Sequence, residues 1–572
     1  MSFKNEKIVE EEKCRKCSSL FTITDKDLEF YEKISPVFNW EKYSIPSPTM
    51  CPKCRQQDRL IHQNMSKLYW RTCDLTWERI LSCFHPESGY TVYKQESWWS
   101  GDFDASEYGR DYDLSRWFFE QFDELLKKVP VPSMFTNFTE DVNSDYTNYA
   151  GFDKNCYFIF HADMNEDCCF AIWLKKCKKC FDSLNVFECE NTYECINVKK
   201  SYGLKYSQDC QNCSESWFLR DCFGCKDCFG CIGLQNAQYQ IFNEQKTKEE
   251  YETFMENFSS DHKSITAMKK KFEDFISDKP RKFAQMLQNE NAVWDHIFEC
   301  RDVVSCFDIQ ESRDMKYCER IYNGPNADCM DIDQYGLKIN RAYLGSAVWD
   351  GVEQMIACTC SYGIVNTYYS MFTFYSENCF GCVGLKNAKY CILNKQYTKE
   401  KYEELVPKII EKMKQDSEWW EFFPSSMSPF GYNETVANEY FPLKKQQAQE
   451  KWFAWSDYET PFPKVEKIIP AAKLPSSISD IPDDILAWAI ECEATKKPFR
   501  ITRQELDFYR NHNLPIPRRH PEQRHLDRMN MRNPRKLYER SCDKCDKEIQ
   551  STYDASGSET VYCEECYNKA IY

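Results

Sequence analysis

Glycine and histidine are scarce in this chain, with 17 glycines and 8 histidines among 572 residues. The sequence has no glycine-rich phosphate loop, no nucleophile elbow and no His-Glu-x-x-His helix, so the common signatures of nucleotide-binding and hydrolytic enzymes are missing. It also has no run of about 18 apolar residues that could span a bilayer. Because the opening MSFKNEKIVEEEKC lacks an apolar export segment, we expect a soluble cytoplasmic protein without a membrane partner.

Cysteine, in contrast, is abundant. The chain has 33 cysteines, and an odd number cannot pair completely within one molecule. Without a secretion signal, such cysteines are expected to be thiols and metal ligands in a reducing compartment, not disulfides. The formal net charge of −16 argues against a surface that coats nucleic acid throughout, although it leaves local basic patches open.

The two ends of the chain are diverged copies of one module. Residues 46–97 and 515–566 align without a gap, so that Asn64 matches Asn533 and Lys67 matches Lys536. Upstream, "FTIT" matches "FRIT" and "LEFY" matches "LDFY". Thr502 and Glu505 have the spacing of a capping box, which predicts a helix that begins after Thr502.

Each copy keeps one of two four-cysteine sets built from Cys-x2-Cys pairs. The complete sets are Cys14, Cys17, Cys51 and Cys54 at the N-terminus, and Cys542, Cys545, Cys563 and Cys566 at the C-terminus. The equivalent positions in the opposite copies are Cys492, Thr495, His520 and Gln523, and Cys73, Thr76, Lys94 and Ser97. Four thiolates suit tetrahedral Zn²⁺ and leave no open coordination position. We therefore expect about two structural zinc ions per chain, and ordinary buried thiols at Cys73 and Cys492.

The middle of the chain contains two cysteine-rich blocks. The cysteine spacing that starts at Cys177 recurs 33 residues later from Cys210, and "CFGCIGLQNAQYQIFNEQ" from Cys228 returns as "CFGCVGLKNAKYCILNKQ" from Cys379. Short β-rich runs on such a repeat favour stacked solenoid coils with cysteine as a small core residue. The alternative is a string of small zinc-held modules, because Cys-x2-Cys pairs also have the spacing of zinc knuckles.

These features give a multi-domain fold class, mainly β with helices: two β-solenoid-like blocks flanked by duplicated zinc-ribbon or treble-clef-like modules. A helix is expected from Tyr112 to Val129, where apolar residues recur at helical spacing. The predicted segments are an N-terminal zinc module (1–110), a helical connector (111–150), the first block (151–245), a helical insert (246–294), the second block (295–398), a helix with a Pro/aromatic strap (399–485) and a C-terminal zinc module (486–572).

Several motifs together resemble a known group of proteins. They are "CPKCR", "KLY", "ESWWS", "YGRDYDLSRWFFEQF", the repeated "CFGC-x-GL-x-NA-x-Y" and "VYCEEC". With them, the chain resembles the uncharacterised cysteine-rich zinc-ribbon proteins of ultra-small bacteria of the candidate phyla. The resemblance covers nearly the whole chain and implies zinc ribbons and a bacterial cytoplasm, but no activity.

Positive charge is concentrated near the C-terminus. Between Lys496 and Arg540, thirteen Lys and Arg residues stand against five Asp and Glu residues. A row of arginines falls mostly at helical spacing, and it consists of Arg524, Arg528, Arg532 and Arg535. Such a row could contact phosphates of a nucleic acid, or it could pair with acidic residues of the chain itself. Acid pairs such as Asp331 and Asp333 are expected to face solvent.

The residue patterns favour a zinc-stabilised scaffold that binds a macromolecular partner, protein or RNA, without catalysis. One alternative is an RNA- or ribosome-binding protein that uses the basic C-terminal module. A second alternative is a thiol-based metal carrier or enzyme that uses the cysteines of the blocks.

Overall fold

The computed structural model describes residues 6–321, 326–334, 339–349, 351–462 and 464–571. In this part of the chain the fold is rich in β-sheet and includes twelve α-helices. The chain divides into two compact units. The first comprises Met1–Met134, Ala284–Tyr458 and Gln550–Thr552, and the second comprises Phe135–Phe283, Glu459–Ile549 and Tyr553–Tyr572. Each unit therefore combines one cysteine-rich block with the module from one end of the chain.

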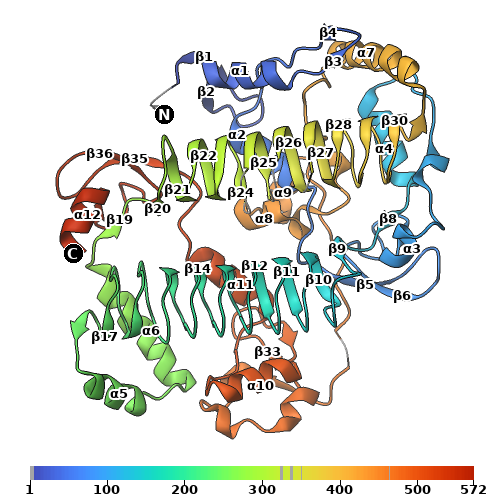
Figure 1. Ribbon diagram of the computed structural model, residues 1–572. Coiled ribbons are helices and arrows are strands. Elements are labelled where there is room, and N and C mark those ends of the chain that lie inside the picture. Colours follow the sequence, from blue (N-terminus) through green and yellow to red (C-terminus); the bar gives the residue numbers. More distant parts are fainter. Residues whose placement is uncertain (1–5, 322–325, 335–338, 350, 463, 572) are drawn as a thin grey trace. The chain divides into compact units, whose positions relative to one another are not determined.

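The first cysteine-rich block, in the second unit, is a parallel ladder of short strands (Figure 1). From Thr147 on, successive strands pair in chain order with partners twelve residues apart, as in Ile159 with Ala171 and Ile196 with Gln208. The strands are β9 (Thr136–Asn137), β10 (Tyr146–Gly151), β11 (Tyr157–Asp163), β12 (Cys169–Lys175), β13 (Leu184–Phe187), β14 (Ile196–Lys199), β15 (Gln208–Gln211), β16 (Lys226–Phe229) and β17 (Gln238–Ile241). Isolated bridges continue the same twelve-residue step between β15 and β16.

Within this ladder the backbone conformation repeats every three residues. Every third residue has a positive φ, in the left-handed region, as at Asn155, Phe158 and His161. The buried core residues also recur at multiples of three, from Cys156 to Cys231. The expected repeat of 33 residues is therefore not the structural step. Thirty-three is a multiple of three, so residues 33 apart both point into the core. It is not a multiple of twelve, so they do not occupy equivalent positions on their rungs.

Cysteine and serine satisfy backbone groups that point into this core. The N–H of Cys180 donates to Sγ of Cys168 at 3.4 Å, and the N–H of Cys213 donates to Oγ of Ser201 at 3.1 Å. The thiols donate in turn to carbonyl oxygens, as Cys222 does to Arg220 O at 3.3 Å. Buried backbone groups must be paired, and a small side chain that both donates and accepts can pair them without filling much space. Cysteine is thus a core residue here, as the sequence predicted.

Aspartate takes the same inward role near the start of the ladder. Oδ1 of the fully buried Asp153 accepts hydrogen bonds from the backbone N–H and the side-chain amide of Asn165, both at 2.9 Å. Its Oδ2 has no hydrogen-bond partner among the described residues. Burial without a cation raises the pKa of Asp153 to about 8.

We expect Asp153→Asn to remove a pH dependence of folding stability. An unfolded aspartate has a pKa of about 3.9, so the neutral carboxyl of the folded state costs stability progressively as the pH rises from about 4 to 8, by at most about 1.4 kcal/mol per pH unit. Asparagine keeps the Oδ1 acceptor and stays neutral. Denaturant unfolding between pH 5 and 9 should show a shallower slope and a higher stability at pH 8. An unchanged slope would contradict the prediction.

The second cysteine-rich block, in the first unit, is a less regular ladder that includes longer strands. Its strands are β20 (Met286–Leu287), β21 (Val293–Phe298), β22 (Arg301–Gln310), β23 (Ser312–Lys316), β24 (Glu319–Ile321), β25 (Asn326–Asp333), β26 (Asn340–Trp349), β27 (Glu353–Tyr362), β28 (Val365–Tyr368), β29 (Glu377–Phe380) and β30 (Lys389–Ile392). The step is twelve at its C-terminal end, where Cys379 pairs with Cys391. It widens to fourteen between Met315 and Cys329, and to thirteen between Cys329 and Ala342.

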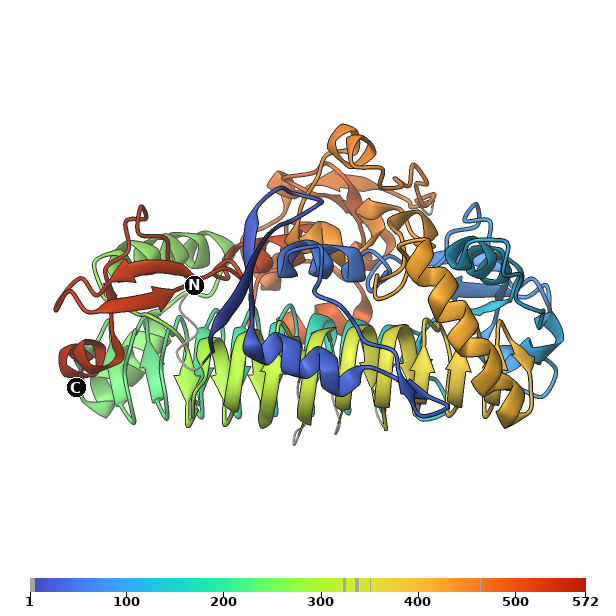
Figure 2. The same cartoon turned by 90° about the horizontal axis from the view of Figure 1, so that it is seen from above.

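Both ladders end in the same way after the repeated CFGC segments. A short antiparallel strand follows, β18 (Glu244–Gln245) or β31 (Lys395–Gln396), and then a helix capped by threonine. These helices are α5 (Lys248–Asn257), capped by Thr247, and α7 (Lys399–Gln415), capped by Thr398. In Figure 2 the gold helix α7 lies beside the last strands of the second ladder. The predicted helical insert holds α5 and α6 (His262–Ser277), but strands resume at Arg281.

The two end modules have matching elements in the same order. The N-terminal module has β1 (Ile8–Lys13), β2 (Leu20–Thr24), α1 (Asp25–Ile34), α2 (Pro52–Leu60), β5 (Tyr69–Thr72) and β6 (Arg79–Ser82), and the C-terminal module has β33 (Ala489–Glu491), β34 (Pro498–Phe499), α10 (Arg503–Asn511), α11 (Pro521–Asn530), β35 (Tyr538–Ser541) and β36 (Glu548–Ser551). The predicted capping box at Thr502 and Glu505 is present, and Thr24 and Asp27 form its counterpart. The blue N-terminal module lies along the yellow-green strands of the second ladder (Figure 2).

The helix expected from Tyr112 to Val129 is shorter than predicted. Helix α4 spans Phe118–Lys128. It begins late because the buried carboxylate of Glu418 accepts the N–H groups of Phe118 and Phe119, at 2.8 and 3.0 Å, and so satisfies the first turn. No helix in the described part of the chain is both long and apolar enough to cross a lipid bilayer.

Candidate metal centres

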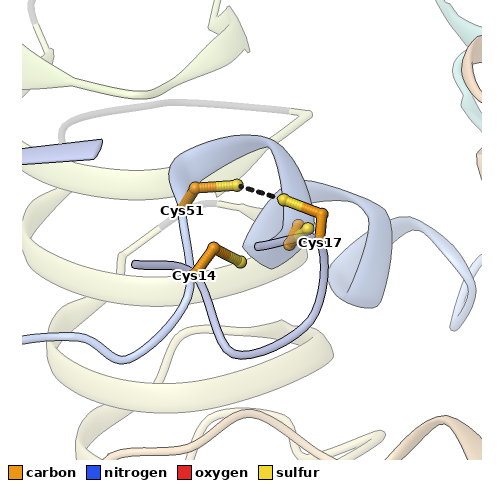
Figure 3. A group of neighbouring side chains, drawn as sticks. Cys14, Cys17 and Cys51 are labelled. Carbon is orange, nitrogen blue, oxygen red and sulfur yellow. Dashed lines mark hydrogen bonds between the residues drawn. The ribbon is translucent and has the colours of Figure 1, made fainter. Parts of the chain in front are cut away.

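The N-terminal cysteine set converges in three dimensions. Cys14 and Cys17 flank the turn between β1 and β2, and Cys51 and Cys54 lie at the start of α2, where Pro52 begins the helix. The four sulfur atoms lie within 4.8 Å of one another, with 3.7 Å between those of Cys17 and Cys51. Figure 3 shows three of these side chains facing the same small space. The set can therefore hold one metal ion.

The C-terminal set converges in the same way. Cys542 and Cys545 flank a tight turn after β35, whereas Cys563 and Cys566 lie at the start of α12 (Glu564–Ile571). The four sulfur atoms again lie within 4.8 Å of one another, and those of Cys545 and Cys563 are 3.8 Å apart. This geometry forms a second group that can hold a metal ion.

In each group the pKa of at least one thiol is lowered, whereas that of a neighbouring thiol is raised, as at Cys54 and Cys566. The neighbouring thiol of Cys54 is the largest influence on Cys51 and helps to lower its pKa to about 5. Burial opposes ionisation of Cys542, but the backbone N–H groups of Cys563, Lys544 and Cys545 lower its pKa to about 6. Metal binding needs deprotonated sulfur, and four such donors fit a tetrahedral ion. Among the described residues, no third group of Cys, His, Asp and Glu side chains converges so closely.

Each incomplete set retains one cysteine and the turn that follows it, but lacks the other three thiols. The sulfur of the buried Cys73 accepts the N–H groups of Thr76 and Lys94, at 3.4 and 3.3 Å. The sulfur of Cys492 likewise accepts the N–H of Thr495 at 3.4 Å. Backbone hydrogen bonds thus hold both residual cysteines, which are buried, as the sequence predicted.

The structure places the first two arginines of the C-terminal row inside the second unit. Arg524 and Arg528 are 6% and 5% exposed. Both pair with the fully buried Asp182 of the first ladder, Arg528 at 3.1 Å, and Arg524 also pairs with Glu505 at 3.3 Å. The nucleic-acid interpretation of these two residues is therefore corrected. Their spacing of four aligns them on the face of α11 that packs against the ladder, so they do not face solvent phosphates.

The other two arginines of the row are half-buried. The guanidinium of Arg532 lies 5.9 Å from the centre of the Trp173 ring. Arg532 and Arg535 both have interactions within the chain. The row as a whole therefore does not form a free basic surface.

The N-terminal module contains the equivalent pair, which the sequence reasoning missed. Arg55 and Arg59 align with Arg524 and Arg528. In the first unit both pair with Asp331, at 2.8 and 3.0 Å, and Arg59 also pairs with Asp333 at 2.5 Å. All four side chains are almost completely buried, so the expectation that Asp331 and Asp333 face solvent was wrong. The alignment of the two arginine pairs was the available signal.

No protein-family model, curated protein or solved structure matches the chain.

Proposed function

We propose that the protein is a non-catalytic, zinc-stabilised scaffold that binds a macromolecular partner. The observation that carries this proposal is that each four-cysteine group belongs to a module anchored to its ladder by buried arginine–aspartate pairs. A tetrahedral ion with four protein ligands has no open position for a substrate, so its role is structural. The fold of each module positions its two arginines, and the ion pairs of these arginines attach the module to the ladder.

The proposed metal is zinc, at about two ions per chain. Four cysteine thiolates in paired Cys-x2-Cys turns are typical of structural zinc sites. We further propose that the modules are zinc ribbons and that both ladders are β-solenoids, since their strands advance in chain order by a nearly constant step. The resemblance to zinc-ribbon proteins of candidate-phylum bacteria agrees with this proposal, as does a reducing cytoplasm, where the many thiols would persist.

Isolation of the tagged protein from its native cell tests this function. A scaffold should carry about two zinc ions and a stoichiometric partner. Nucleic acid that travels with the protein and leaves at high salt would instead favour the RNA- or ribosome-binding alternative. Metal well above two ions per chain, or iron–sulfur absorbance, would favour the thiol-based carrier or enzyme.

A further inference from the structure

A hollow of about 570 Å³ lies within the first unit, beside the N-terminal metal group. One wall comes from Arg15 and Lys16, which stand between Cys14 and Cys17, and another from the start of α4. The segment after α7 and the residues around Phe453 complete it. Its volume is in the range of small-ligand sites, about 300–1,000 Å³.

The walls of the hollow are strongly aromatic. The aromatic lining residues are Trp117, Phe119, Phe422, Phe423 and Phe453. Trp117 is 61% exposed, although a tryptophan side chain ordinarily packs against the core. An exposed indole beside a hollow offers a face on which a ligand can stack.

Acidic residues outnumber basic residues in the same lining. The acidic residues are Asp58, Glu120, Asp416, Glu418 and Glu421, and the basic residues are Arg15, Lys16 and Lys451. Most of these carboxylates already pair with cations of the chain: Glu421 with Arg15, and Asp416 and Glu120 with residues outside the lining. Glu418 accepts two N–H groups of α4 and has no ion pair to a cation among the described residues. Burial raises the pKa of Asp58, Glu418 and Glu421, because each carboxylate has lost part of its hydration.

One cation of the chain, the ammonium group of Lys16, already contacts both an aromatic ring and a carboxylate of this lining. The Nζ atom of Lys16 lies 4.8 Å from the centre of the Phe453 ring while its ammonium group pairs with Asp58. A cation over an aromatic face, with a carboxylate beside it, is a favourable arrangement that strengthens with desolvation.

We propose that this hollow binds an organic cation, namely an ammonium or guanidinium group at the end of an alkyl chain. The cation could belong to a lysine or arginine side chain of a partner protein, or to a free polyamine. The inference rests on the proposed function, because the zinc-bound turn positions Arg15 and Lys16. The C-terminal module, which lost the equivalent cysteine set, has Glu493 and Ala494 at the positions of Arg15 and Lys16.

Titration calorimetry of the zinc-loaded full chain at low salt tests the inference. The probes are an end-blocked pentapeptide with two lysines, the same peptide with two glutamates, and spermidine. We expect the lysine peptide, spermidine or both to bind, the glutamate peptide not to bind, and added salt to weaken the binding. Tighter binding of the lysine peptide identifies a protein side chain as the source, whereas tighter binding of spermidine identifies a polyamine.

Two tryptophan variants locate the binding site. Trp117→Ala should weaken binding about fivefold or more, because it removes an aromatic face whose attraction for a cation strengthens where the contact is partly desolvated. Trp77→Ala is the matched control, since Trp77 is 79% exposed in the same unit but does not line the hollow. No binding of either cation at millimolar concentration, or equal binding by Trp117→Ala and the wild type, would overturn the inference. Zinc measured in the same samples separates the proposals, because a zinc-free wild type would count against the proposed function.

Discussion

Replacement of Cys566 by serine is expected to remove one zinc ion per chain and to unfold the C-terminal metal group, with little effect on the N-terminal one. Structural zinc contributes about 10–16 kcal/mol to the folding of small zinc peptides, which is as large as the stability of a whole domain. Cys54→Ser should have the mirror effect at the N-terminus. Elemental analysis gives the metal content, and limited proteolysis shows which end has loosened.

Cys73→Ser is the matched control for these ligand variants. Cys73 occupies a ligand position of an incomplete set, and its sulfur accepts backbone N–H groups instead. This variant should keep about two zinc ions. Full zinc retention by both Cys54→Ser and Cys566→Ser would rule out the two four-cysteine sites.

Asp182→Ala is expected to destabilise the second unit by about 3–5 kcal/mol, because it leaves the buried Arg524 and Arg528 without their shared counter-ion. Glu505 still pairs with Arg524, but no ion pair to another carboxylate is present for Arg528 among the described residues. Denaturant unfolding measures the loss, and proteolysis should release the C-terminal module. Asp331→Ala in the first unit should have a comparable cost, because Asp333 still pairs with Arg59 but no other carboxylate pairs with Arg55 among the described residues.

Glu194→Gln is the control for Asp182→Ala. Glu194 lies twelve residues after Asp182, one step along the ladder, but it is partly exposed and pairs with Lys269. Such a pair contributes at most about 1 kcal/mol. A combined Asp182→Leu, Arg524→Met, Arg528→Leu and Glu505→Gln variant should recover much of the stability, because it replaces the whole buried ion cluster and leaves no unpaired carboxylate at Glu505. An Asp182→Ala variant as stable as the wild type would contradict the anchoring role.

The sequence predicts features whose cause is local, and it predicted the metal groups for this reason. A Cys-x2-Cys pair fixes one turn, and the alignment of the two ends showed which pairs belong together. The partners of the arginines were not predictable in this way, since Asp182 precedes Arg524 by 342 residues. The late start of α4 has the same explanation, because its cap, Glu418, is 300 residues from Phe118.

The twelve-residue step was hidden by a coarser repeat. The spacings that start at Cys177, to Cys180, Cys189 and Cys195, are all multiples of three. Spacings in multiples of three indicate that the inward-pointing positions recur every three residues. The repeat of 33 residues was easier to see in the sequence. How many three-residue steps separate hydrogen-bonded neighbours depends on backbone pairing. Twelve occurs among the cysteine spacings, but so do other multiples of three, so the cysteines alone do not single it out.

The constant step of the first ladder makes its length adjustable in fixed increments. Insertion or deletion of twelve residues would add or remove one rung and change the span by one strand spacing, about 4.8 Å, while every other residue keeps its inward or outward orientation. A change of one or two residues would instead push core side chains outward. In the second ladder, rungs with one or two additional residues occur where the step widens to thirteen or fourteen. Insertions and deletions of whole rungs can therefore change the distance between the two ends of the ladder in equal steps without disrupting its core.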